Sequence, residues 1–262
     1  MRDYLLVAIE AAKAAGYFIK ERIGNIRQED VTFKSSSDYV TEIDVHSEKI
    51  IIEHLKKHFP THHIMAEESS RHYKKAEYLW IIDPLDGTTN FIHGFPVLGV
   101  SIALMYKGEL VLGVIYDPIR DELFYAENSA GAFLNERKIK ISLLSDPSLS
   151  LIATGFPFRN KKFIESYIKI FRELLFSVSD LRRAGAAAID LAYVACGRVD
   201  GFFEFSLNPW DIAAGVVLIK EAGGLVSDFD GSDSYLSSGN IIAGNKVIHS
   251  FLVESIRKSL KN

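Results

Sequence analysis

The sequence predicts a mixed α/β (α+β) fold, and three features of its 262 residues indicate it. Residues 3–22 and 41–58 each repeat apolar side chains at the spacing of an amphipathic helix. Residues 97–141 contain short runs of β-branched and aromatic residues separated by turn signals, which is typical of an antiparallel meander. From residue 150 onward, strand-like and helix-like segments alternate, which favours an α/β arrangement.

The pattern changes near Asp146, so we expect one domain, residues 1–262, built of two lobes at about 1–145 and 146–262. In the first lobe, strands are expected at 64–69, 78–82, 99–106, 110–116, 123–127 and 132–135. In the second lobe, strands are expected at 150–154, 178–182, 200–205, 225–228 and 241–244, and helices at 160–176, 186–196, 211–222 and from 246 onward.

The composition is that of a soluble globular protein, because 48% of the residues are hydrophobic and 24% are charged. A net charge of −4 gives no electrostatic reason to expect nucleic-acid binding. Cys196 is the sole cysteine, which excludes an intrachain disulfide and fits a reducing compartment. No apolar run approaches the length of a membrane span, and Glu10 and Lys13 interrupt the first one, unlike a signal peptide. We therefore expect a cytoplasmic protein with no membrane partner.

The rest of the chain is organised around the segment 78–92. Its apolar start predicts a buried strand that ends at Asp83, where Pro84 stops ladder pairing and bends the chain. Asp86 and the glycine after it form a turn signal, and residues 88–90 are of the types that open a helix. Two carboxylates are thus expected beside the backbone N–H groups of a new helix.

Such an arrangement suits a phosphate held together with a divalent metal ion. Helix N-terminal N–H groups attract anions, and clustered carboxylate oxygens bind hard cations such as Mg²⁺. A second apolar strand leads into Glu67, which places another acid near the same sheet edge as Asp83. A solvated Asp-x-x-Asp-Gly turn is common in proteins, but the longer string here is much more specific.

That longer string, D-P-L-D-G-T-T-N-F at residues 83–91, resembles a signature of the inositol monophosphatase family of lithium-sensitive, Mg²⁺-dependent phosphatases. Glu-Glu-Ser at 67–69 and Trp-Asp-Ile-Ala-Ala-Gly at 210–215 resemble further family motifs, in the same order. The resemblance covers nearly the whole chain. It implies an α-β-α-β-α layered sandwich and hydrolysis of a small phosphorylated polyol or sugar, with myo-inositol monophosphate first.

The resemblance also implies roles for individual residues. The implied metal ligands are Glu67, Asp83, the Leu85 carbonyl, Asp86 and Asp211. The implied catalytic residues are Glu67, Thr88 and Asp44, and the implied substrate-binding residues are Gly87, Thr88, Gly185, Ala186, Ala187 and Glu204. Two or three Mg²⁺ ions are expected per site, with Mn²⁺ as an alternative and with Ca²⁺ and Li⁺ as inhibitors.

The implied mechanism is an in-line displacement at phosphorus by a metal-activated water, with no covalent phosphoenzyme. Thr88, polarised by Asp44, would orient the water, and the N–H groups of Gly87 and Thr88 would cradle the phosphate. The serine-rich loop at 34–38 is expected to act as a lid that closes over substrate and helps to form a third, weaker metal site.

Structural roles would also explain several of these residues. Asp44 can complete a capping box with Thr41, and Asp211 is a natural N-cap for the helix that follows it. Arg182 matches a family arginine that pairs with an aspartate, here Asp200, which we interpret as a structural contact.

The choice of substrate stays open at this stage. Thr89 replaces the lysine typical of the nucleotide-bisphosphate and histidinol-phosphate branches, which disfavours both. A dual-specificity fructose-1,6-bisphosphatase/inositol monophosphatase is one alternative. A non-enzymatic partner of RNA or of the transcription machinery is a second, although the acidic net charge disfavours it, and a divalent-cation store is a third. A homodimer is expected from the family resemblance.

Overall fold

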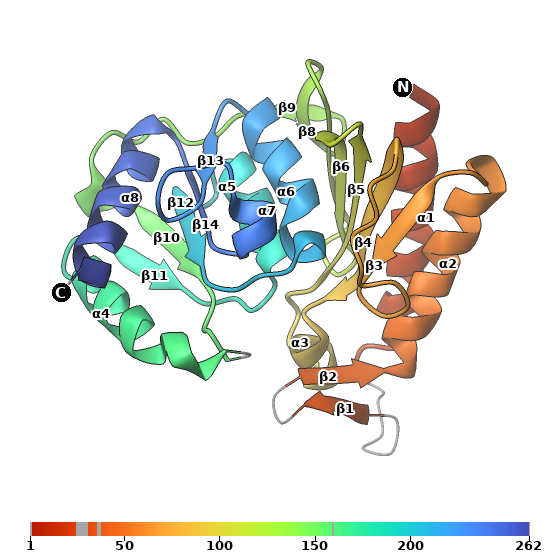
Figure 1. Cartoon of the computed structure of the whole chain (residues 1–262), viewed down its shortest axis with the longest axis horizontal. Helices are drawn as coiled ribbons and strands as arrows, with labels where there is room; N and C mark the ends of the chain where they lie inside the picture. Colours follow the sequence, from red (N-terminus) through yellow and green to blue (C-terminus); the bar gives the residue numbers. More distant parts are fainter. Residues whose placement is uncertain (1, 25–30, 36–37, 159, 262) are drawn as a thin grey trace.

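The computed structural model describes residues 2–24, 31–35, 38–158 and 160–261. For residues 2, 31–35, 38–41 and 261 it describes the backbone only. Its elements form five layers, which are visible side by side in Figure 1. From the N-terminal side these are a helix pair, a seven-stranded sheet, a second helix pair, a five-stranded sheet and a third helix pair. The α-β-α-β-α sandwich implied by the family resemblance is therefore confirmed.

The first layer is the helix pair α1 (Arg2–Lys20) and α2 (Glu42–His58). Helix α1 turns an alanine-rich stripe toward the sheet, and Ala8, Ala11 and Ala15 are fully buried there. Small side chains let the helix approach the sheet closely, and larger ones such as Ile51 and Trp80 fill the remaining space.

The seven-stranded sheet has the strand order β3-β4-β5-β6-β7-β8-β9. Only β3 and β4 are parallel, and every other neighbouring pair is antiparallel. Its strands are β3 (His63–Ala66), β4 (Tyr78–Asp86), β5 (Gly99–Tyr106), β6 (Glu109–Asp117), β7 (Glu122–Glu127), β8 (Gly131–Leu134) and β9 (Arg137–Ile139). The predicted meander is confirmed, but β9 was not predicted, because three residues carry almost no periodic signal.

Strand β4 does not end at Asp83, so that expectation was wrong. The strand continues to Asp86 through a bulge. Asp83 pairs with Ser101 and Asp86 pairs with Gly99, so β4 has one residue more than β5 between these two pairs. Pro84 lies inside the bulge, which is one of the few places where a sheet accepts a residue without an N–H group. After the bulge, the Asp86 side chain contacts the N–H of Ala188 in the middle helix layer.

The middle layer contains α5 (Ala187–Ala195) and α6 (Pro209–Glu221), both buried between the two sheets. They are apolar on almost every side, as expected of helices covered by a sheet on each face. The short helix α3 (Thr88–Ile92) follows β4, as the sequence predicts. It lies beside the hairpin of β1 (Val31–Ser35) and β2 (Asp38–Thr41) in Figure 1.

The five-stranded sheet has the order β11-β10-β12-β14-β13. Its strands are β10 (Leu151–Thr154), β11 (Asp180–Arg182), β12 (Gly201–Glu204), β13 (Leu225–Ser227) and β14 (Ile241–Gly244). Helices α4 (Ile164–Leu175) and α8 (Lys246–Lys261) cover its outer face, and α7 (Tyr235–Ser238) is a single turn that was not predicted. Among the described residues, no helix is long and apolar enough to cross a bilayer.

Candidate active site

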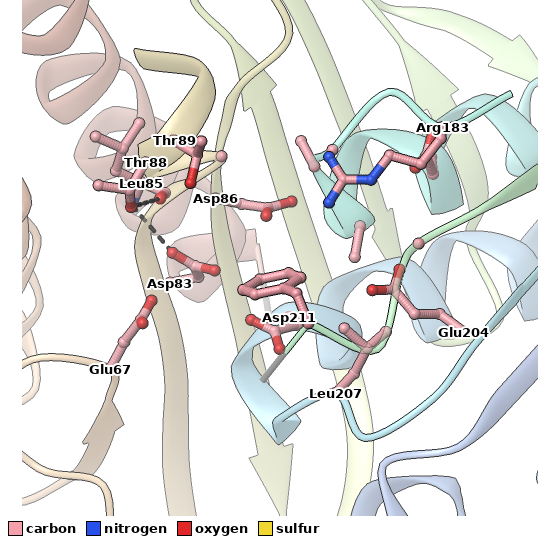
Figure 2. A pocket seen from close by; sticks show the side chains of 17 residues that line it. Glu67, Asp83, Leu85, Asp86, Thr88, Thr89, Arg183, Glu204, Leu207 and Asp211 are labelled. Atoms are coloured by element: carbon pink, nitrogen blue, oxygen red, sulfur yellow. Dashed lines mark hydrogen bonds between the residues drawn. The ribbon is translucent and has the colours of Figure 1, made fainter. Parts of the chain in front are cut away.

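A cavity of about 280 Å³ opens between the two sheets, and residues from both halves of the chain line it. Figure 2 shows Glu67, Asp83 and Thr88 on one side of this cavity, Arg183 and Glu204 on the other, and Asp86 and Asp211 between them. The lining residues are Glu67, Asp83, Leu85, Asp86, Gly87, Thr88, Thr89, Gly155, Phe158, Arg183, Gly185, Ala186, Ala187, Asp190, Glu204, Leu207 and Asp211. All residues predicted from the sequence for the site belong to this set except Asp44.

Parallel pairing of β3 and β4 brings the first two acids to the same edge of the sheet. Ala66 is in register with Ile82, so Glu67 and Asp83 both follow the last paired residues. The N–H group of Glu67 still donates to the Ile82 carbonyl at 3.2 Å, which keeps the two chains together one residue further. Glu48 of α2 then holds the turn after Glu67 by accepting from two backbone N–H groups.

Asp83 is only 1% exposed and lies among three other carboxylates. Burial raises the pKa of Asp83 well above its usual range, and the nearby charges of Glu67, Asp86 and Asp211 raise this pKa further. A hydrogen bond that its Oδ1 accepts from the Leu85 N–H, at 3.0 Å, acts in the opposite direction. Four acids around one cavity therefore destabilise each other in the absence of a cation.

Asp86 links the two halves of the site. Its Oδ2 accepts a hydrogen bond of 2.6 Å from the N–H of Ala188, in the first turn of α5. This contact joins the end of β4 to the start of a helix one hundred residues away in the chain. A carboxylate at a helix N-terminus is also electrostatically favourable.

Asp211 lies at the start of α6. We expected it to be the N-cap, and that expectation was wrong. The helix begins one turn earlier, because Asn208 takes the cap position and Pro209 occupies the first helical residue. The Asp211 carboxylate reaches back and accepts the Asn208 N–H at 2.7 Å, which is the reciprocal arm of a capping box. The cap fixes the orientation of one Asp211 oxygen while the residue still lines the cavity.

The hydroxyl of Thr88 connects the cavity wall to a buried acid behind it. Thr88 Oγ1 lies 2.8 Å from Asp44 Oδ1 and 3.2 Å from the Leu85 carbonyl oxygen. The resemblance implied the contact with Asp44, and the structure contains it. The proposed capping partner of Asp44, Thr41, lies outside the residues whose side chains are described.

Gly87 gives the backbone at this corner a conformation that other residues resist. Its φ is +95°, and an added Cβ would lie 3.0 Å from the Val97 carbonyl oxygen. Asn90 secures the corner, because its Nδ2 donates to the carbonyl groups of Val97 and Ala184 at 2.7 and 2.9 Å. This second contact brings the segment before α5 against α3.

The far end of the cavity is formed by Glu204, Arg183 and Asp190, and only the first was predicted as a site residue. Glu204 ends β12, and its carboxylate occupies the space beside Gly155. Arg183 is exposed, and its guanidinium lies 5.0 Å from the ring centroid of Phe156. The signal that could have revealed Asp190 is its position as the single acid in an otherwise apolar helix.

The predicted pair of Arg182 and Asp200 does not form. Arg182 pairs instead with its neighbour on β11, Asp180, at 2.5 Å, and both side chains are about half exposed. Asp200 accepts hydrogen bonds from the Ser142 hydroxyl and the Leu151 N–H. A nearby hydroxyl and a backbone N–H therefore serve as the partners of Asp200 in place of the arginine. The lid expectation rests partly on residues 36–37, which lie outside the described part of the chain.

The donors at the acidic end suit a hard divalent cation. Glu67, Asp83, Asp86 and Asp211 offer carboxylate oxygens, Leu85 offers a carbonyl, and the described residues of the lining include no histidine or cysteine. Among the described residues, no group of three or more histidine, cysteine, aspartate or glutamate side chains lies close enough together to hold a metal ion. Mutual repulsion keeps bare carboxylates apart, at roughly 4 kcal/mol for two charges 4 Å apart at an effective dielectric near 20. The donor set therefore fits Mg²⁺.

Comparison with known proteins gives a consistent result. The Inositol monophosphatase family matches residues 1–261. The Nus factor SuhB of Pseudomonas aeruginosa is 46% identical over 265 residues, which cover 99% of this chain and 98% of that protein. The crystal structure of extragenic suppressor protein SuhB from Bartonella henselae matches with a TM-score of 0.94 at 42% identity, covering 98% and 99% of the two chains. The inositol monophosphatase from Anabaena matches with a TM-score of 0.88 at 41% identity, covering 98% and 96%. The chain therefore belongs to the inositol monophosphatase family.

Proposed function

We propose that this protein is a Mg²⁺-dependent phosphatase that hydrolyses myo-inositol monophosphate to inositol and phosphate. The observation that supports this most directly is the convergence of acids from β3, β4 and α6 on one cavity that also holds the Thr88–Asp44 pair. The cavity of about 280 Å³ lies just below the usual range for ligand pockets, roughly 300–1,000 Å³. It suits a small phosphate ester.

Glu67, Asp83, Asp86, Asp211 and the Leu85 carbonyl are the groups proposed to hold the cations. The cations would supply Lewis-acid activation of water and neutralise charge on the phosphate and leaving oxygen. The backbone N–H groups of Gly87 and Thr88 would bind phosphate oxygens at the corner between β4 and α3.

Thr88 is proposed to position the attacking water. Since its hydroxyl proton is directed to Asp44, the Thr88 oxygen keeps its lone pairs available to accept a hydrogen bond from that water. A water held this way presents its own lone pair to phosphorus. Glu67, which lies on the same side of the cavity in Figure 2, is the proposed acid beside the water.

The leaving group is proposed to lie toward Gly185, Ala186, Ala187 and Glu204. This end of the cavity has both small residues, which leave room for a ring, and a carboxylate, which accepts hydrogen bonds from hydroxyl groups. Dual specificity for fructose 1,6-bisphosphate remains the nearest alternative within the family, and Arg183 is the residue that would favour it.

A second role in transcription is supported by the names of full-length relatives. The Pseudomonas aeruginosa relative, and relatives from Escherichia coli at 44% identity, carry the name Nus factor SuhB. We propose such a role for this chain as an additional binding duty, since the phosphatase residues are retained. Capture of transcription proteins by a catalytically inactive variant would test it. Inhibition by Li⁺ and a homodimeric state are further proposals from family membership.

The first experiment is phosphate release from inositol 1-phosphate and from fructose 1,6-bisphosphate, with Mg²⁺ or with EDTA. Asp86→Asn is the test variant, because the amide oxygen still accepts from Ala188 while the charge is lost. We expect at least a hundredfold loss, roughly the lower bound for removing a group that acts in the transition state. Asp180→Asn, an exposed acid on β11, is the matched control.

The possible outcomes discriminate the alternatives. Mg²⁺-dependent turnover of inositol 1-phosphate that is lost in Asp86→Asn supports the proposal. Comparable turnover of the bisphosphate indicates a dual-specificity enzyme. Absence of turnover with both substrates would contradict the proposed substrate class and leave the binding role as the leading one.

A further inference from the structure

Asp190 is a buried acid that the proposed mechanism does not use. It lies in the first turn of α5, is 3% exposed and lines the cavity. Within the described part of the chain, no hydrogen-bond donor reaches its carboxylate. Its backbone N–H is satisfied, because it donates to the Ala186 carbonyl at 3.0 Å. Neither of its oxygens is among the described side-chain atoms that are both fully buried and without a partner, so the carboxylate is accessible from the cavity and its hydrogen-bonding capacity is unused within the protein.

The side chain of Asp190 contributes no hydrogen bond to the described part of the fold. A buried carboxylate without hydrogen-bond donors costs free energy, and an apolar side chain of similar size would pack better among Ile189, Leu191 and the other buried residues of α5. Unsatisfied buried groups in native proteins are uncommon, and each calls for an explanation such as a catalytic role or a bound water or ion. The position of Asp190 on the cavity wall identifies the side from which a ligand would come.

Two charged residues accompany Asp190 at this end of the cavity. Glu204 and Arg183 both line it, and Figure 2 shows them on the side opposite Glu67 and Thr88. Gly155 leaves room for Glu204, because an added Cβ would lie 2.0 Å from its carboxyl group. Gly185 leaves room for Arg183 in the same way, at 2.5 Å from its guanidinium nitrogen. Two glycines therefore clear space for the charged groups around Asp190.

We propose that Asp190 is a specificity-determining residue that hydrogen-bonds a hydroxyl group of the polyol part of the substrate. This inference rests on the proposed phosphatase function. With the phosphate bound near Gly87 and Thr88, the rest of the substrate reaches toward Glu204 and Asp190 across the same cavity. Adjacent hydroxyl groups both donate and accept hydrogen bonds, which matches a site of two carboxyl groups and one guanidinium.

The charges at this end also define what the site rejects. A second phosphate group only accepts hydrogen bonds, and among the described residues it would lie beside the two carboxyl groups of Glu204 and Asp190 and the one guanidinium of Arg183. Burial and the charge of Glu204 raise the pKa of Asp190, against an opposing effect of Arg183. A neutral Asp190 carboxyl group would donate one hydrogen bond and accept others. The subsite therefore favours a monophosphate of a neutral polyol over a bisphosphate.

The test compares a polyol phosphate with a phosphate ester that has no hydroxyl groups. Initial rates of wild type, Asp190→Val and Asp190→Asn are measured with inositol 1-phosphate and with phenyl phosphate in Mg²⁺. Asp190→Val replaces the carboxyl group with methyl groups of similar volume, whereas Asp190→Asn keeps a neutral donor and acceptor. Asp180→Val, on an exposed strand, controls for the loss of one charge. Thermal melts of all four proteins accompany the kinetics.

The measured quantity is the ratio of kcat/KM for inositol 1-phosphate to kcat/KM for phenyl phosphate. We expect Asp190→Val to lower this ratio about tenfold, the loss of one substrate hydrogen bond, and Asp190→Asn to restore most of it. Both Asp190 variants should melt no lower than wild type, because no internal contact is lost.

Several results would overturn the inference, and each differs from failure of the proposed function. A wild-type ratio in Asp190→Val would show that the carboxyl group does not contact the polyol. An unfolded Asp190→Val protein would show that the fold needs this carboxyl group. Equal losses of the ratio in Asp190→Asn and Asp190→Val would refute its role as a hydrogen-bonding group. Absence of wild-type turnover with both esters would instead refute the phosphatase function on which the inference rests.

Discussion

At the scale of single residues, Thr88 shows how a buried partner sets the chemistry of a half-buried hydroxyl group. A hydroxyl carries one proton, and the contact of 2.8 Å with Asp44 competes with one of 3.2 Å to the Leu85 carbonyl. The shorter, charge-assisted contact is favoured. Asp44 is 1% exposed and is fixed within α2, so the direction of the Thr88 proton is fixed by the fold.

This geometry predicts different outcomes for two substitutions of Thr88. Thr88→Val keeps the shape and removes the hydroxyl group, so we expect kcat to fall about a hundredfold, the lower range for a proton-transfer group. Thr88→Ser retains the hydroxyl group and should keep most of the activity. Steady-state kinetics with inositol 1-phosphate test this, and equal activity of Thr88→Val and wild type would contradict the role of Thr88.

At the scale of elements, the bulge in β4 determines which side chains face the cavity. The backbone groups freed by the bulge find partners locally: the Pro84 carbonyl accepts the Ser47 hydroxyl at 2.8 Å, and the Leu85 N–H binds Asp83. Because side chains alternate along a strand, one extra residue changes the face on which Asp86 lies relative to Asp83. Helix α2 thus holds the bulge in place through Ser47.

Gly155 follows β10 and lies beside Glu204 at the end of β12, and this contact predicts the effect of a substitution. This glycine is not in the left-handed region, so Gly155→Ala is compatible with the backbone, but its Cβ would lie 2.0 Å from the Glu204 carboxyl group. The end of the Glu204 side chain would have to move, and we expect KM for inositol 1-phosphate to rise about tenfold with little change in stability.

Kinetics of Gly155→Ala, Glu204→Asp and the double variant test whether these residues act together. The shorter aspartate relieves the clash, so the two effects should be less than additive. An unchanged KM in a folded Gly155→Ala protein would show that the position of Glu204 does not matter for binding.

The contact between α2, β3 and β4 contains His62, which predicts a pH effect on stability. Its Nδ1 accepts the Trp80 indole N–H at 3.1 Å, and its ring stacks on Tyr78 at 4.3 Å. Burial, followed by the charge of Lys56, lowers the pKa of His62 below 6.5 in the folded state. The unfolded chain therefore binds this proton more readily, so the contribution is full above pH 6.5 and is lost as pH falls toward the folded pKa.

Melting temperatures of wild type and His62→Phe between pH 8 and pH 5 check this effect. The difference between the two proteins at each pH isolates His62, because His249 and the buried acids titrate in both. We expect wild type to lose stability relative to His62→Phe as the pH falls below 6.5. A difference that does not depend on pH would contradict the assignment.

The sequence predicted most elements because their patterns are local, and it failed where the answer depends on distant partners. The bulge at Pro84 requires the register with Gly99 and Ser101, which no property of residues 78–92 reveals. Asp211 was placed at the wrong cap position because Asn208, three residues earlier, competes for it. The acids at strand ends could be predicted from the apolar residues just before them. Asp190 could be recognised as a site residue only from the packing of α5 against the cavity.

At the scale of the whole molecule, the site lies between two sheets and depends on both. Glu67, Asp83 and Asp86 belong to the seven-stranded sheet and its ends, Asp211 belongs to α6, and Glu204 belongs to the five-stranded sheet. Apolar packing of α5 and α6 holds these parts together. The carboxylates act in the opposite sense, since like charges from different layers repel each other across the cavity.

This opposition predicts that Mg²⁺ stabilises the folded protein. A cation that binds only the folded state at one hundred times its dissociation constant adds about 2.7 kcal/mol to the free energy of unfolding. For a chain of this size that corresponds to a rise in Tm of roughly 5–10 °C relative to EDTA. Asp83→Asn removes a charge from the centre of the cluster, so the variant should melt higher than wild type in EDTA and gain less from Mg²⁺. Calorimetry of both proteins in EDTA and in Mg²⁺ measures the two effects, and a wild-type Tm that Mg²⁺ leaves unchanged would contradict a metal site built from these carboxylates.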